Sequence, residues 1–87
     1  MKLPATATLA QAPELLRQLG DNTEVIDASD LTEFDTSAVA LLLEARRRAA
    51  AGGRTLRVDG APRKLVELSL LYGVDELLGF TPAAQPG

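Results

Sequence analysis

The segment from residue 36 to residue 51 constrains the fold most, because its apolar residues repeat with the spacing of an amphipathic helix. One helical face holds positions i, i+3, i+4, i+7 and i+11, which are Ala38, Leu41, Leu42, Ala45 and Ala49. Three oxygen-bearing residues precede or begin this run: Asp35, Thr36 and Ser37. Asp35 or Thr36 is suited to the N-cap, since its side-chain oxygen can accept a hydrogen bond from a free backbone N–H group. The pattern therefore predicts a helix from about Thr36 to Ala51, which Gly52 and Gly53 end.

Shorter segments around this helix have the composition of strands. Residues 24–28 are mostly apolar and predict a short buried strand, and residues 55–58 alternate between polar and apolar. Residues 3–9 alternate weakly and contain two threonines, which favours a further strand at the N-terminus. Residues 31–34 are predicted to form a loop that inserts Phe34 into the core.

Two more helices are expected. Pro13 suits a first helical turn, residues 14–19 continue the helix, and Gly20 closes it. Pro62 begins another helix, whose Leu65, Leu68 and Tyr72 recur at helical spacing before Gly73. Residues 74–78 are expected to add a last turn or two.

The order of these elements predicts an α/β domain. Strands that alternate with helices favour parallel pairing through helical crossovers. We expect a mixed, mostly parallel sheet of about four strands, with the helices mainly on one face. Residues 1–80 would form a single domain, and residues 81–87 a flexible tail, because that stretch is rich in proline and alanine.

Composition excludes several classes of function. The 87 residues include no cysteine and no histidine, which removes disulfides, thiolate chemistry, the usual zinc ligands and the commonest general base. The net charge is −3, so the basic face of a nucleic-acid-binding protein is not expected. No phosphate-binding motif or metal-ligand spacing stands out, which predicts neither a cofactor nor enzymatic activity. No signal peptide or membrane-spanning run is visible, and a cytoplasmic protein is expected.

The helix start at Asp35-Thr36-Ser37 is the candidate functional site. On one interpretation these residues only cap the helix. On the other, the Ser37 hydroxyl faces outward, and a phosphate there would add about −1.5 to −2 charges, which would switch binding of a partner. The cluster Arg46-Arg47-Arg48 is either a solvated helix face or part of a docking surface.

The turn and helix of residues 35–43 resemble the signature of the STAS domain family, which includes anti-sigma-factor antagonists and the tails of sulfate transporters. The strand at residues 25–27, the loop at 31–34 and the closing segment 65–74 fit the same family, so that the resemblance spans about residues 24–78. It is closest to the STAS subunit of the Mla phospholipid-transport ABC complex.

The resemblance implies a non-catalytic accessory subunit whose partner contact comprises Asp35, Thr36, Ser37 and Ala38. Thr36 corresponds to the threonine that contacts the transporter ATPase in Mla-type subunits. Ser37 corresponds to the serine that a partner kinase phosphorylates in anti-sigma-factor antagonists, and this is the alternative function. Ala38 stands where both patterns favour glycine. A Mla-type role would bring the protein to the cytoplasmic face of the inner membrane through the transporter complex.

Overall fold

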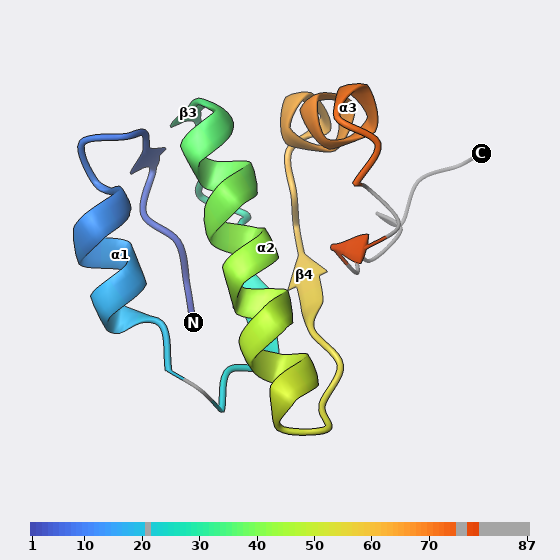
Figure 1. Ribbon diagram of the computed structural model, residues 1–87. Coiled ribbons are helices and arrows are strands. Elements are labelled where there is room, and N and C mark those ends of the chain that lie inside the picture. The colour runs from blue at the N-terminus through green and yellow to red at the C-terminus, as the bar shows by residue number, and fades with distance from the viewer. Residues whose placement is uncertain (21, 75–76, 79–87) are drawn as a thin grey trace.

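The computed structural model describes residues 1–20, 22–74 and 77–78, and these form an alternating α/β chain. Figure 1 shows the elements along the chain. Their order is β1 (Thr6–Ala7), α1 (Ala12–Gln18), β2 (Val25–Asp27), β3 (Glu33–Phe34), α2 (Thr36–Ala51), β4 (Arg57–Asp59) and α3 (Arg63–Leu71).

The strands pair in parallel as two short ladders. In one, β1 lies beside β3, and in the other, Ile26 of β2 lies opposite Val58 of β4. The N-terminal segment also runs beside β2, where the Leu3 N–H donates to the Asp27 carbonyl at 2.8 Å. One segment thus connects both pairs, and every pairing among the described residues is parallel. The expected small α/β fold is confirmed.

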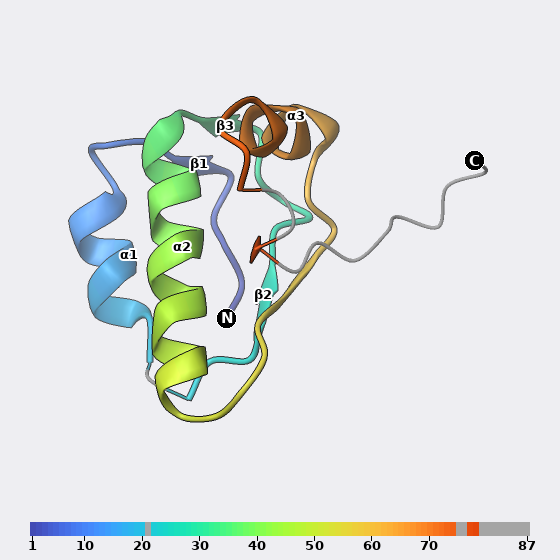
Figure 2. The same ribbon diagram turned by 45° about the vertical axis from the view of Figure 1, so that its right-hand side comes forward.

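Two helices lie side by side over one face of the strands, as Figures 1 and 2 both show for α1 and α2. The third helix, α3, crosses the end of the molecule near the start of α2. The start of α2 therefore lies between the loop before α1, where the Leu9 N–H donates to Asp35, and the end of α3, where Tyr72 lines a pocket with Thr36.

The core forms between the strands and the inner faces of the helices. Ile26 and Val58 are fully buried at the centre of their strands, and Leu42 and Leu65 are fully buried on α2 and α3. All five apolar residues of the predicted α2 face are buried. The spacing of the apolar residues in the sequence therefore determines which face of α2 is buried, because residues at the 3.6-residue helical repeat lie on one side of the helix.

The turn between β4 and α3 depends on Gly60. Its backbone φ is +67°, a value that residues with a side chain rarely adopt. A Cβ atom at this position would also lie 2.8 Å from the Cβ of Ser29. Only glycine fits this turn without displacing the loop after β2.

Several expected boundaries change. Residues 31–34 are not only a loop, since Glu33–Phe34 forms β3, and the expected strand at residues 3–9 is reduced to Thr6–Ala7. The prediction for α2 is confirmed at both ends, and α3 ends at Leu71 with Tyr72 as its C-cap. The turn expected at 74–78 falls partly outside the described residues, and the expected tail at 81–87 falls entirely outside them.

Candidate functional site at the start of helix α2

Asp35 caps α2 and joins it to a distant loop. One carboxylate oxygen, Oδ1, accepts a hydrogen bond from the Ser37 N–H at 2.9 Å, and Oδ2 accepts one from the Leu9 N–H at 3.1 Å. These two backbone donors, followed by the Ser37 hydroxyl, hold the pKa of Asp35 below its usual value. The charged carboxylate therefore fixes both the helix start and the loop between β1 and α1.

The four residues expected to contact a partner differ in exposure. Thr36 is exposed as the first residue of the helix, and Ser37 is half-buried beside it. Ala38 is only 1% exposed, so its methyl group packs in the core. Asp35 is exposed but already accepts two hydrogen bonds. Thr36 and Ser37 thus present side chains at this site, and partner contact itself stays a prediction.

An apolar groove lies on each side of the outer face of α2. The α2–α3 groove, of about 330 Å³, is lined by Thr36, Val39, Ala40, Leu43, Tyr72 and Val74. The α1–α2 groove, of about 380 Å³, includes Ser37, Ala40, Leu9 and Leu16 in its lining. Ala40 borders both grooves, and the residues at the helix start divide between them. Neither groove was predicted from the sequence, although the spacing of Thr36, Ala40 and Leu43 places these three side chains on one outer face of the helix.

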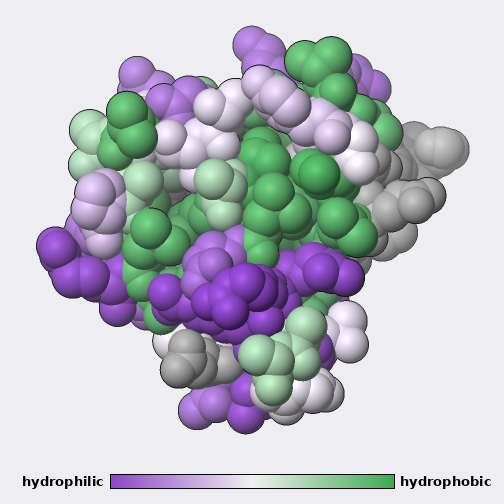
Figure 3. Space-filling view, in the orientation of Figure 1, coloured by the Kyte–Doolittle hydropathy of each residue, from purple (hydrophilic) through white to green (hydrophobic). Residues whose placement is uncertain are grey.

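Large apolar side chains are exposed around these grooves. Leu9 is 72% exposed and Tyr72 is 56% exposed. Figure 3 shows apolar side chains gathered over the upper part of this face, with a band of hydrophilic side chains crossing below them. An exposed apolar area with a polar border is typical of a protein interaction surface.

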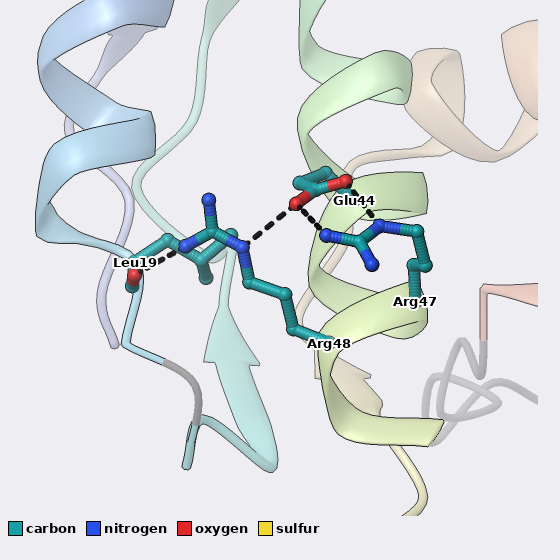
Figure 4. A network of polar contacts seen from close by, with 4 residues as sticks. All are labelled: Leu19, Glu44, Arg47 and Arg48. Carbon is teal, nitrogen blue, oxygen red and sulfur yellow. Dashed lines mark hydrogen bonds and ion pairs between the residues drawn. The ribbon is translucent and has the colours of Figure 1, made fainter. Parts of the chain in front are cut away.

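A charged cluster lies farther along α2, below the apolar region. Figure 4 shows Glu44 between two arginines. The Glu44 carboxylate accepts hydrogen bonds from Arg47 at 2.7 and 2.8 Å and from Arg48 at 2.7 Å, and these bonds lower its pKa to about 2. Arg48 also donates to the Leu19 carbonyl at 2.7 Å, which ties the end of α1 to α2. Part of the arginine cluster thus stabilises the packing of the two helices.

The acidic side chains that precede α2 in the sequence have separate structural roles. Asp27 accepts a hydrogen bond from the Ser29 N–H at 2.9 Å, and Asp30 pairs with Lys2 at 3.2 Å. Within residues 1–20, 22–74 and 77–78, no group of acidic side chains is arranged to hold a metal ion. The same residues include no helix that is both long and apolar enough to span a membrane.

The fold and the helix start define a small α/β domain in which the start of α2 borders two apolar grooves. The chain matches a family model described as "Mlab, STAS domain" over residues 2–79, and it belongs to this family of STAS domains. Members of this family are generally non-catalytic accessory domains, and membership implies a protein partner. A comparison with curated proteins found no significant match.

Proposed function

We propose that this protein is a non-catalytic accessory subunit that binds the ATPase of an Mla-type phospholipid ABC transporter. The Mlab-type family match over residues 2–79 supports this class of partner. The observation that carries the proposal is the position of Thr36, which is exposed at the edge of the apolar α2–α3 groove. The protein would then work at the cytoplasmic face of the inner membrane, held there by the transporter.

The groove supplies the features that a docking surface needs. Tyr72 and Leu43 offer apolar area, and aromatic residues at the centre of an interface contribute much of the binding free energy. Thr36 and Ala40 are small, so a partner backbone can approach α2 closely. Asp35, rather than Thr36, supplies the side chain that caps the helix, so we expect α2 to tolerate substitution of Thr36.

Thr36→Glu tests the proposal without weakening the helix. An acidic residue in the first helical turn interacts favourably with the helix dipole, so the variant should fold at least as well as the natural protein. The bulkier, charged side chain should abolish copurification with the ATPase. Thr55→Glu is the matched control, because Thr55 is also exposed and follows the other end of α2. Copurification of Thr36→Glu at the level of the control would contradict the role of Thr36.

The alternative function is an anti-sigma-factor antagonist controlled by phosphorylation of Ser37. It is supported by the position of Ser37 on the border of the α1–α2 groove, where a phosphate would change the charge of the docking face. We expect incubation with ATP and an anti-sigma serine kinase to add one phosphate at Ser37, located by mass spectrometry, and Ser37→Ala to remove the modification. No phosphate, or a phosphate at another residue, would reject this alternative.

A further inference from the structure

We propose that residues 9–19, which comprise α1 and its two flanking ends, form an arm that opens from α2 as one unit while the strands stay folded. Two side chains of α2 hold the arm closed, Asp35 at the start of that helix and Arg48 near its end. This motion does not depend on the function proposed above.

Each end of the arm is held by a hydrogen bond between its backbone and a charged side chain of α2. The Asp35 carboxylate accepts from the Leu9 N–H at 3.1 Å, and Arg48 donates to the Leu19 carbonyl at 2.7 Å. Figure 4 shows Arg48 reaching from α2 to Leu19, with Glu44 bonded to the same guanidinium group. At 1.5 Å per residue, roughly 20 Å of α2 separates the two bonds. Hydrogen bonds to charged groups are stronger than neutral ones, so these two contacts carry much of the attachment.

Between these two bonds, the arm buries few side chains against the rest of the molecule. Leu15 is the one buried residue of α1, and Leu19, just past the helix, is also buried. Leu16 is 36% exposed and lines the α1–α2 groove, whose volume of about 380 Å³ separates the outer parts of the two helices. An element with few buried apolar contacts opens at a lower free energy than the core does.

Helix α1 depends on its attachment to stay helical. It has seven residues, and the side chain of its N-cap residue, Gln11, does not cap it but accepts hydrogen bonds from Thr8 instead. Isolated helices shorter than about 12 residues are marginally stable in water. Once the arm leaves α2, the helix should therefore unwind, and its amides should exchange with solvent together.

The core is built mainly outside the arm. Of the buried apolar residues that the structure describes, only Leu15 and Leu19 belong to residues 9–19. The β2–β4 ladder pairs within itself, with Ile26 opposite Val58, and both side chains are fully buried. The strands can thus remain paired when the arm opens. Opening widens the α1–α2 groove and releases one oxygen of Asp35 at the candidate site.

Hydrogen exchange of the full chain in low concentrations of urea, followed by NMR, tests this motion. The reporters in the arm are the amides of Leu15 and Leu19, which donate at 3.0 Å to the carbonyls of Gln11 and Leu15. The reporters in the core are the amides of Ala28 and Arg57, which donate between β2 and β4 at 2.8 and 2.7 Å. We expect the two arm amides to share one protection factor, about ten-fold or more below that of the core, with a weaker dependence on urea. Equal urea dependence of arm and core, or unequal protection of Leu15 and Leu19, would overturn the proposal.

A mild core substitution separates opening of the arm from unfolding of the whole chain. Ile26→Val should lower the protection of Ala28 and Arg57 by roughly two- to ten-fold, because it removes one buried methyl group. The protection of Leu15 and Leu19 should not change, since the open arm leaves the contacts of Ile26 in place. If Ile26→Val lowers the protection of the arm as much as that of the core, α1 opens only when the whole chain unfolds, and the proposal is wrong.

Two neighbouring arginines test how the arm is held. Arg48→Ala removes the bond to the Leu19 carbonyl and should lower the protection of Leu15 and Leu19 about ten-fold, the usual effect of losing a hydrogen bond to a charged group. Arg47→Ala is the matched control, because Arg47 bonds to Glu44 as Arg48 does, and it should change this protection by less than about two-fold. Equal effects of the two substitutions, or no effect of Arg48→Ala, would show that Arg48 does not hold the arm.

Discussion

At the scale of single residues, Asp35 connects two segments that are 26 positions apart in the sequence. Asp35→Ala removes both hydrogen bonds, so it should lower the urea midpoint of unfolding and speed exchange of the Leu9 amide hydrogen. Asp35→Asn retains one acceptor oxygen, which can still cap the helix at Ser37, but its NH₂ group cannot accept from Leu9. We expect Asn to keep most of the stability and to lose the protection of Leu9. Slow exchange at Leu9 in both variants would show that Asp35 does not hold this loop.

The two hydrogen bonds of Asp35 also show what a sequence can predict at this scale. The bond to Ser37 spans two residues and follows from the preference of Asp for the N-cap, so a capping residue at Asp35 or Thr36 was predicted. The bond to Leu9 depends on how β1 and α1 pack beside α2, and no local pattern carries that information. For the same reason, the burial of Ala38 could be predicted from the helical period, whereas the division of Thr36 and Ser37 between two grooves could not.

At the scale of elements, the length of a segment decides how well its pattern predicts structure. Helix α2 repeats its apolar face over 16 residues, and both of its ends were predicted. Strands β1 and β3 have only two residues each, so no alternation can be read from them. Their pairing comes from the tertiary structure, in which the Thr32 and Glu33 N–H groups both donate to the Ala5 carbonyl at 2.8 and 2.9 Å. A two-residue strand is therefore a result of the fold rather than a feature of its own sequence.

At the scale of the whole molecule, four carboxyl groups among the residues that the structure describes have lowered pKa values, each because the folded chain gives the carboxylate hydrogen bonds. Arg17 lowers the pKa of Glu14, the Ser29 side chain and N–H lower that of Asp27, and the remaining two are Asp35 and Glu44. The chain contains no histidine, so no imidazole titrates between about pH 5 and 8. The pH dependence of stability below neutrality is therefore set by carboxyl groups spread over α1, β2 and α2.

The sign of this dependence follows from the direction of the shifts. A carboxyl group whose pKa is lowered by folding stabilises the protein above its unfolded pKa, and this stabilisation is lost as the pH falls through its folded pKa. For Glu44 the window runs from the ordinary value of 4.5 down to about 2. We expect the urea midpoint, followed by circular dichroism, to fall steadily over this range. Glu44→Gln should make the fall less steep, because the glutamine cannot titrate, whereas an unchanged slope would mean that the Glu44–Arg47–Arg48 cluster contributes nothing to acid sensitivity.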